Sequence, residues 1–262
     1  MTIPVYQVDA FTKQLYSGNP AAICPIPAWI PDEQMQMIAF ENNLAETAFV
    51  VPEGNDFHIR WFTPTIEVAL CGHATLAAAF VFYNQLGYMG ENIRFNSLSG
   101  WLTVTPEVNG GFTLDFPADP PISISNIPDG LFEGLGIEKR TVYKGKFDYM
   151  VEVGDQEMLA NLKPDFKKLS TIPSRGILVT AEGNDVDFVS RCFFPQSGID
   201  EDPVTGSAHC LLTPFWAAKK GKDNLKAIQL SQRKGWIECR LKNDRVLMSG
   251  HAVLFLKGEI FT

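Results

Sequence analysis

The same short motif occurs twice in this chain, about half its length apart. The segment CGHATLAAAFVFY, which begins at Cys71, and the segment TGSAHCLLTPFWA, which begins at Thr205, each place a Gly, then a His or a Ser, then an Ala before an apolar run. Setting the second beneath the first pairs Gly72 with Gly206 at an offset of 134 residues. A periodicity of this kind is the sequence signature of a duplicated structural unit. It therefore predicts a fold made of two related halves.

Two further stretches extend the repeat in the same order. The segment IRFNSLSGWLTV aligns with IQLSQRKGWIEC, so that Trp101 falls on Trp236. After these, NGGFTLDF aligns with NDRVLMSG, and the turn pairs Asn109-Gly110 and Asn243-Asp244 supply residues that tolerate the positive φ of a hairpin turn. Each half is therefore predicted to contain strands, one apolar helix and a β-hairpin.

The repeated helix is expected to be buried rather than laid on a surface. The runs TLAAAFVFY and LLTPFWAA are apolar on most sides of a helix. Strands wrapped around one such helix indicate two similar α+β halves. A proline-rich linker over residues 115–130 separates them, so the first half is predicted at 1–118 and the second at 119–262, with the last strand free to pack against the first half. A separate amphipathic helix is predicted to begin at Pro31.

The formal charge of −8 and the pI near 5.0 limit the partners of the chain. A negative field repels phosphate backbones and anionic lipids, so neither nucleic acid nor a membrane is expected as a partner. The longest apolar run, residues 74–83, has about half the length of a membrane span. The segment MTIPVYQVDAFT lacks the pattern of a signal peptide, and the five Cys include no C-x-x-C pair. These features predict a cytoplasmic protein with reduced thiols and no metal site.

The start of each repeated helix is a candidate ligand-binding site. A helix N-terminus has unpaired backbone N–H groups and a partial positive charge, which together bind carboxylates or oxyanions. Small residues there let a ligand approach the backbone, and two starts related by pseudo-twofold symmetry are expected to grip one small anionic metabolite in the cleft between the halves. Tight helix packing is the alternative explanation for the same residues. The residues predicted to contact this ligand are Gly72, Ala74, Thr205 and Gly206.

Three side chains near these helix starts are candidates for proton transfer. Glu46 lies between apolar residues in NNLAETAFV, and a carboxyl in such surroundings suits a general acid or base near neutral pH. An exposed glutamate on an edge strand is the simpler alternative. Asp202 precedes the second helix. From this position we expect it to cap the helix, to take part in the chemistry, or to do both. His73 follows Gly72 at the start of the first helix.

Four motifs of the chain resemble those of one family. The segments VDAFTKQLYSGNPAAI, NNLAETAFV, CGHATLAAA and GIDEDPVTGSAHC together look like the PhzF-like family of phenazine biosynthesis, which has the diaminopimelate epimerase-like fold. The resemblance runs from Val8 to Cys210 in family order and so covers nearly the whole chain. It implies two pseudo-symmetric halves, each an antiparallel, barrel-like sheet around a central helix, with the active site between them.

The resemblance also implies a set of active-site residues. The acid/base glutamate of the family falls on Glu46 in NLAET, and its histidine falls on His73 in CGHAT. Its aspartate and serine fall on Asp202 and Ser207 in EDPVTGS. The best-understood member of the family isomerises a dihydro-hydroxyanthranilate by moving a hydrogen between carbons without a cofactor. The resemblance further suggests a homodimer.

The leading hypothesis is a cofactor-independent isomerase in which Glu46 removes a proton from an acidified carbon and returns it elsewhere. A racemase or epimerase is the first alternative, because Cys71 precedes Gly72 and His73 as in proline racemase, although the repeat places Thr205 rather than a second Cys opposite it. Cys71 also replaces the small residue common in PhzF-like relatives.

A metabolite-binding protein without turnover is the second alternative. The chain has neither G-x-S-x-G nor G-x-G-x-x-G, which argues against a serine hydrolase and a nucleotide-binding protein.

Overall fold

The computed structural model describes residues 2–262 and divides into two compact units. The first unit consists of the residues up to Phe116 together with Leu247–Thr262, and the second consists of Pro117–Val246. The chain thus passes from one unit to the other twice. Its last segment belongs with the beginning of the chain because the final strand pairs with the first one.

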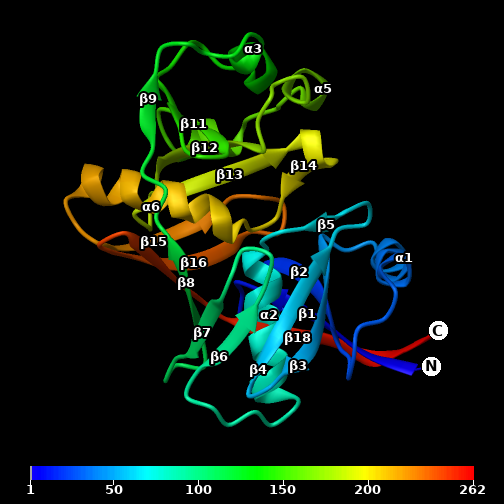
Figure 1. Cartoon of the computed structure of the whole chain (residues 1–262). Coiled ribbons are helices and arrows are strands. Elements are labelled where there is room, and N and C mark those ends of the chain that lie inside the picture. The colour runs from blue at the N-terminus through cyan, green and yellow to red at the C-terminus, as the bar shows by residue number, and fades with distance from the viewer. Residues whose placement is uncertain (1) are drawn as a thin grey trace. The chain divides into compact units, whose positions relative to one another are not determined.

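Strands dominate the first unit, and two helices interrupt them (Figure 1). Its elements are β1 (Thr2–Ala10), β2 (Asn19–Pro25), α1 (Asp32–Asn42), β3 (Glu46–Glu53), β4 (Asp56–Phe62), β5 (Glu67–Val68), α2 (Gly72–Asn84), β6 (Ile93–Asn96), β7 (Leu102–Pro106), β8 (Phe112–Pro117) and β18 (Ala252–Phe261).

The second unit has the same kind of composition, with one long helix and several short ones. Its elements are β9 (Ile122–Ile124), α3 (Leu131–Leu135), β10 (Val142–Lys144), β11 (Asp148–Glu152), α4 (Gln156–Ala160), α5 (Phe166–Leu169), β12 (Gly176–Glu182), β13 (Phe188–Phe194), η1 (Pro195–Ser197), β14 (Ile199–Asp202), α6 (Gly206–Lys220), β15 (Asn224–Gln229), β16 (Gly235–Lys242) and β17 (Arg245–Gly250), the last of which crosses into the first unit.

The strand pairing is mixed, which corrects the antiparallel sheets expected from the resemblance. In the first unit β2 pairs in parallel with β3, and β4 pairs in parallel with β6. In the second unit β11 and β12 are parallel, as are β13 and β15. A helix lies between the two strands of each of these pairs in the chain: α1, α2, α4 with α5, and α6. Parallel neighbours need such a crossover connection, because a tight turn reverses the chain and makes only antiparallel pairs.

The two units repeat the same order of strand pairings. In the first, β1–β2 is antiparallel, β2–β3 parallel, β3–β4 antiparallel, β4–β6 parallel and β6–β7 antiparallel. In the second, β10–β11, β11–β12, β12–β13, β13–β15 and β15–β16 follow the same alternation. The strands that contain or follow the two Gly-Trp pairs, β7 and β16, therefore occupy equivalent places. This agreement extends the sequence repeat to the level of topology.

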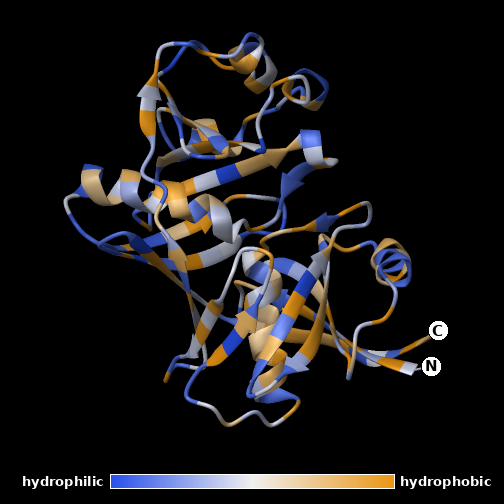
Figure 2. Ribbon diagram, viewed as in Figure 1, coloured by the Kyte–Doolittle hydropathy of each residue, from blue (hydrophilic) through white to orange (hydrophobic). Residues whose placement is uncertain are grey.

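Both repeated helices begin at the glycine that the sequence predicted. The helix α2 begins at Gly72 and α6 begins at Gly206, and α1 has Pro31 as its N-cap. Every residue of α2 from Gly72 to Phe82 is buried, and the helix packs against β1, β2 and β3. Figure 2 shows α2 mostly in apolar colours, whereas α1 carries hydrophilic residues along its length. No helix in the described part of the chain is both long and apolar enough to cross a membrane.

The hairpin turns also follow the sequence, and the chain passes between the units at Phe116 and Pro117, within the proline-rich segment, although that segment is not only a linker. Gly110 and Asn243 have φ values of 81° and 54°, and they lie in the β7–β8 and β16–β17 turns. Residues 115–130, expected to be a linker, instead contain the end of β8 and all of β9, which pairs with β10. Prolines are compatible with a strand that is this short, because they precede its first residue and remove no hydrogen bond from its interior.

Candidate functional site

Four side chains of the first unit meet at the start of α2. His73 is the second residue of α2, and Cys71 directly precedes the helix. Glu46 opens β3 and Asn19 opens β2. Because β2 and β3 are parallel neighbours, their first residues lie at the same end of the sheet. The parallel crossover through α1 thus brings residues distant in sequence to one place.

His73 contacts the other three side chains. Its Nε2 lies 3.1 Å from Glu46 Oε2, and its Nδ1 lies 3.1 Å from Asn19 Nδ2 and 3.5 Å from Cys71 Sγ. An amide can donate through nitrogen or, after a flip, accept through oxygen, so Asn19 accommodates both protonation states of Nδ1. Only 5% of the His73 side chain and 13% of the Glu46 side chain are exposed. Electrostatic interactions in this group are therefore only weakly screened by water.

The Glu46 carboxylate is within ion-pair range of His73 but is not aligned with it for a hydrogen bond. Its buried Oε2 makes no hydrogen bond to any residue in 2–262. Leaving a buried acceptor unpaired costs free energy, so its presence calls for a reason. Such an oxygen can still accept a hydrogen bond from a bound ligand or from water.

Burial and charge act in opposite directions on these groups. Burial lowers the pKa of the His73 imidazole, whereas Cys71 and Glu46 raise it, and the net pKa lies well above its ordinary value. Burial, with a smaller contribution from Glu46, raises the pKa of the Cys71 thiol to about 11. Cys71 is therefore protonated at neutral pH.

The same three residues supply the donor types of a metal site. The ligand atoms of Glu46, Cys71 and His73 all lie within 4.8 Å of one another. Zinc binds carboxylate, thiolate and neutral imidazole, so one such ion could be held here. Binding would require both the thiol and the imidazole to lose their protons, against the raised pKa of each. The protonation states at neutral pH therefore disfavour metal binding.

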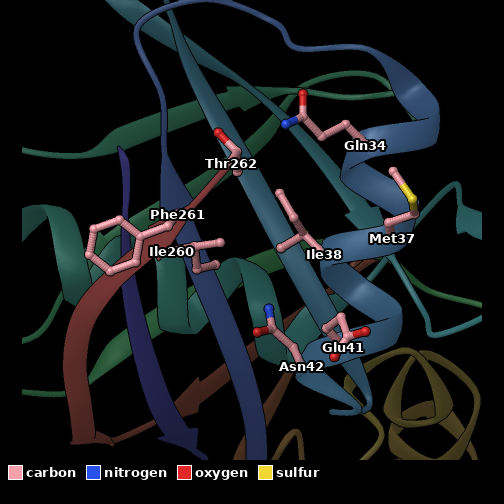
Figure 3. Close-up of a pocket in the computed structure, with 8 residues that line it drawn as sticks. All are labelled: Gln34, Met37, Ile38, Glu41, Asn42, Ile260, Phe261 and Thr262. Atoms are coloured by element: carbon pink, nitrogen blue, oxygen red, sulfur yellow. The ribbon is translucent and has the colours of Figure 1, made fainter. Parts of the chain in front are cut away.

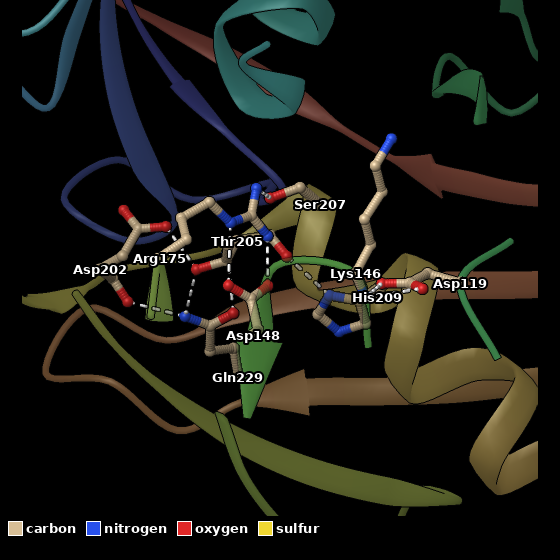
Figure 4. A network of polar contacts seen from close by, with 9 residues as sticks. All are labelled: Asp119, Lys146, Asp148, Arg175, Asp202, Thr205, Ser207, His209 and Gln229. Atoms are coloured by element: carbon tan, nitrogen blue, oxygen red, sulfur yellow. Dashed lines mark hydrogen bonds and ion pairs between the residues drawn. The ribbon is translucent and has the colours of Figure 1, made fainter. Parts of the chain in front are cut away.

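At the start of α6, the second unit has an arginine where the first unit has a glutamate. Arg175 directly precedes β12, Asp148 opens β11, and Ser207 is the second residue of α6. Arg175 donates through Nε to Asp148 Oδ1 at 2.9 Å, through Nη2 to the other carboxylate oxygen, and through Nη1 to Ser207 Oγ at 3.2 Å (Figure 4). Asp148 is 3% exposed and Arg175 is 34% exposed. Since a guanidinium has five N–H donors, it retains the capacity to bind a further acceptor such as a carboxylate.

Asp202, Thr205 and Gln229 hold the turn that leads into α6. The Thr205 hydroxyl donates to the Asp202 carboxylate at 2.5 Å, and the Thr205 backbone N–H donates to Gln229 Oε1 at 2.8 Å. The Gln229 amide donates in turn to the Asp202 carbonyl at 2.7 Å. All three residues are buried (Figure 4). The Asp202 side chain thus anchors Thr205, the N-cap residue of α6.

Neither helix start is capped by the side chain of its N-cap residue, Cys71 before α2 or Thr205 before α6. In both helices a side chain of the first turn bonds backwards to the N-cap carbonyl instead. The Thr75 hydroxyl donates to the Cys71 carbonyl, and His209 Nδ1 donates to the Thr205 carbonyl at 2.8 Å. Burial lowers the pKa of His209 to about 4, so its ring is neutral at neutral pH and Nδ1 carries the single N–H donor.

The structure brings together some of the predicted residues within each unit. In the first unit Glu46 meets His73, while Gly72 and Ala74 form the first turn of α2. In the second unit Asp202 meets Thr205, while Gly206 and Ser207 open α6.

Sequence reasoning missed four polar residues of these groups. The repeat held a signal for three of them, because Asn19 and Asp148 open equivalent strands and Arg175 precedes the strand equivalent to the one that Glu46 opens. Gln229 had no local signal. The missed residues are Asn19, Asp148, Arg175 and Gln229.

Known proteins resemble the chain over its whole length. Residues 8–258 match the family described as phenazine biosynthesis-like protein. A Pseudomonas aeruginosa protein named an uncharacterized isomerase is 48% identical over 260 residues, which cover 99% of both chains. The crystal structure of a PhzF-family phenazine biosynthesis protein from Enterococcus faecalis superposes with a TM-score of 0.95 and 44% identity, over all of both chains.

A more distant structure shares only the fold. The crystal structure of a probable proline racemase from Agrobacterium radiobacter has a TM-score of 0.69 at 12% identity, and the match covers 99% of this chain and 93% of that one. It shows that the architecture extends beyond the phenazine biosynthesis-like proteins. The family match from residue 8 to residue 258, together with the 48% identity over nearly the whole length, shows that the chain belongs to the phenazine biosynthesis-like (PhzC-PhzF) family.

Proposed function

We propose that the protein is a cofactor-independent isomerase that moves a proton between two carbon atoms of a small carboxylate-bearing metabolite. The observation that carries this proposal is the Glu46 carboxylate, largely buried and 3.1 Å from His73 Nε2. The isomerase named among its relatives, 48% identical over the full length, supports the same class of reaction.

In the proposed reaction, Glu46 acts as the base and then as the acid. Its carboxylate accepts a proton from a carbon made acidic by a conjugated carbonyl or carboxylate group, and the C–H electrons pass into that conjugated system. The protonated Glu46 then returns the proton to a different carbon, so the product is an isomer and no electrons are gained or lost. His73 orients the carboxylate and stabilises its charged form before the first step and after the second.

The residues at the start of α6 suit a role in binding rather than in proton transfer. Arg175 stays charged at any physiological pH, so it cannot shuttle a proton, but its planar donors match a carboxylate. The Ser207 hydroxyl lies beside it. We propose that these two groups bind an anionic group of the metabolite, and that Asp202 positions them by holding Thr205.

A two-thiol racemase is the less suitable candidate. Such an enzyme needs a thiolate on each side of the reacting carbon, whereas burial raises the pKa of Cys71 to about 11. Residues 202–207 contain no second Cys. The likeness to a proline racemase at 12% identity therefore supports a common fold and not a common mechanism.

Proton exchange with solvent tests the proposal. Small unsaturated carboxylic acids and amino acids would be incubated with the EDTA-treated protein in deuterated buffer, and deuterium incorporation would be measured by mass spectrometry. We expect exchange by the unmodified protein, and a loss of at least ~100-fold in Glu46→Gln with binding retained in thermal-shift assays. Glu53→Gln is the matched control, because Glu53 is the exposed residue at the other end of β3.

Three results would contradict the proposal. Normal exchange in Glu46→Gln would remove Glu46 from the reaction. Binding of a ligand without any exchange would instead indicate a metabolite-binding protein. Loss of exchange on EDTA treatment, with recovery on adding zinc, would show that the reaction needs a metal ion and would identify the Glu46–Cys71–His73 group as its site.

A further inference from the structure

The Asn19 side chain is buried against the ring of His73. It is 0% exposed, and its Nδ2 lies 3.1 Å from Nδ1 of the imidazole. The other ring nitrogen, Nε2, lies 3.1 Å from the Glu46 carboxylate. The ring therefore stands between an amide and a carboxylate, with one nitrogen facing each of them. Which nitrogen of a histidine carries a proton is set by the hydrogen bond that the other nitrogen makes.

The residues on either side of Asn19 fix its backbone. Gly18 has a φ of 68°, and a Cβ atom there would collide with the Ala10 carbonyl oxygen, so only glycine fits. The ring of Pro20 locks its own φ and restricts Asn19 to extended conformations. The parallel pairing of β2 with β3 then brings this residue to the end of the sheet at which β3 begins. The local sequence thus holds the amide in one place.

The equivalent position of the second unit carries a carboxylate instead of an amide. Asp148 opens β11 as Asn19 opens β2, and it pairs with Arg175, whose guanidinium is always charged. An ionised carboxylate only accepts hydrogen bonds, so it suits a permanent donor. An amide has a donor group and an acceptor oxygen, so it can bond to Nδ1 of an imidazole with or without a proton there. The two units therefore match a carboxylate to a fixed cation and an amide to a ring that can titrate.

The other neighbour of Nδ1 is a poorer hydrogen-bond partner. Cys71 Sγ lies 3.5 Å from Nδ1 and 4.0 Å from Nε2 of His73, and a thiol is both a weak donor and a weak acceptor. The titratable groups that act on the pKa of His73 are Cys71 and Glu46. Asn19 adds a stronger partner that has no net charge.

We propose that Asn19 is a positioning residue for proton transfer: its amide holds Nδ1 of His73, in either protonation state of the ring, so that Nε2 stays directed at Glu46. This inference rests on the proposed function, in which Glu46 carries the proton. Asn19 acts through His73 and transfers no proton itself. An aspartate in its place would also hold the ring, but it would favour the charged form of the ring.

Two variants with nearly the shape of asparagine test this role. Asn19→Leu removes both hydrogen-bonding groups, and Asn19→Asp keeps an acceptor and adds a charge. The probe is the acid that the unmodified protein exchanges fastest in deuterated buffer. We expect kcat for exchange to fall by about 10- to 100-fold in Asn19→Leu, the range found for residues that orient metal-bound histidines. The KM for the same acid should change by less than about twofold, because the variant removes no contact with it.

The protonation of the His73 ring gives a second readout that needs no ligand. In protein labelled with ¹⁵N, the ring nitrogens report the pH at which the ring loses its proton, and His73→Gln identifies their signals. We expect this midpoint to rise by at least about one pH unit in Asn19→Asp, because a nearby carboxylate favours the charged ring. In the unmodified protein, the Asn19 side-chain amide signal should change with the same midpoint, since the amide turns from acceptor to donor as the ring loses its proton.

Asn42→Leu is the matched control. The Asn42 amide donates to the Thr47 hydroxyl at 3.0 Å, and Thr47 points to the face of β3 opposite to that of Glu46. Figure 3 shows Asn42 at a groove of about 250 Å³ between α1 and the end of β18, and the lining of this groove includes none of the four side chains that meet at the start of α2. The control should leave both the exchange rate and the His73 midpoint unchanged.

The outcomes separate this inference from the proposed function. Normal exchange in Asn19→Leu, with exchange lost in Glu46→Gln, would overturn the role of Asn19 and leave the proposed function intact. An unchanged His73 midpoint in Asn19→Asp would overturn that role as well. Normal exchange in Glu46→Gln would overturn both, because no proton transfer would remain for Asn19 to support. Circular dichroism checks that the variants fold. If neither does, the unmodified protein decides, since an Asn19 amide signal that does not follow the His73 midpoint contradicts the inference.

Discussion

At the start of α2 an imidazole meets a carboxylate, whereas at the start of α6 a guanidinium meets a carboxylate and a hydroxyl. The second residue of the helix is His73 in one unit and Ser207 in the other. The third strand of the shared topology begins at Glu46 in the first unit, and Arg175 stands just before its counterpart in the second. The backbone positions correspond, but the side chains differ. A glutamate in the first unit is matched by an arginine of opposite charge in the second, and a histidine is matched by a serine.

Under the proposed function, this difference corresponds to two tasks on one duplicated scaffold. In the proposed function, the group of Glu46 and His73 moves a proton. Arg175 does not titrate, and its partner Asp148 is buried, so their group holds a fixed charge. The two units therefore keep the same strand order and helix starts while the side chains at those starts differ.

The first-turn bond to the N-cap carbonyl shows the same divergence on a smaller scale. Thr75 makes it in α2 and His209 makes it in α6, at positions related by the offset of 134. A hydroxyl and a neutral imidazole both donate one hydrogen bond, so the backbone contact survives the change of residue. The two side chains respond differently to pH, because only the histidine can take up a proton.

Breaking the Arg175 pair should have the largest effect on stability. In Arg175→Met the Asp148 carboxylate stays buried without its partner, and we expect the free energy of unfolding to fall by about 2 to 4 kcal/mol, between the values for exposed and for fully buried pairs. The double variant Arg175→Met/Asp148→Asn should recover part of this loss. Urea unfolding measures both, and Arg140→Met, at an exposed position, is the control.

The equivalent change in the first unit should cost less. Glu46→Gln removes a carboxylate that makes no aligned hydrogen bond to His73, so we expect a loss of less than about 1 kcal/mol in the same experiment. A loss as large as that of Arg175→Met would mean that Glu46 supports the fold in the way Asp148 and Arg175 do, and would weaken the division of tasks.

The two buried histidines should give stability opposite dependences on pH. The folded pKa of His209, about 4, lies below its ordinary value of 6.5, so the unfolded chain takes up this proton first as the pH falls. Its contribution to stability is present above pH 6.5 and is lost by about 1.4 kcal/mol per pH unit between about 6.5 and 4. His209→Gln should remove this slope.

For His73 the sign is reversed, because its folded pKa lies above 6.5. Its contribution is complete below pH 6.5 and is lost as the pH rises through the folded pKa. The difference in unfolding free energy between the unmodified protein and His73→Gln should therefore shrink between pH 6 and pH 9. Urea unfolding at several pH values measures both histidines, and a difference that grows with pH would show that His73 is held neutral.

The smallest expected effect concerns the shared backbone contact. Thr75→Val keeps the shape of the side chain and removes its bond to the Cys71 carbonyl, and we expect a loss of about 1 kcal/mol. Thr75→Ser, which keeps the hydroxyl, should retain that bond. A neutral result for Thr75→Val, measured by thermal unfolding, would mean that the equivalence with His209 is one of position only.

Features that depend on neighbouring residues were predictable. The helix starts at Gly72 and Gly206 followed from small residues set before apolar runs, and the turn at Asn243 followed from its tolerance of positive φ. The contact of Glu46 with His73 was expected from the family resemblance, since no local pattern links residues 27 positions apart. Parallel pairing was not foreseen, because the direction of a neighbouring strand depends on how the chain crosses over and not on the strand itself.

The amino-acid sequence by itself determined the repeat, the apolar helices, their starting residues and the turns, because each depends on periodicity or backbone preference within a few residues. Only the tertiary structure decided that Arg175 stands beside Ser207 and Asp148, and that the last strand, expected to be free to pack against the first half, pairs with β1. Such contacts join residues whose separation along the chain carries no signal. They exist because the parallel crossovers and the return of the last strand bury more apolar surface than local structure could bury alone.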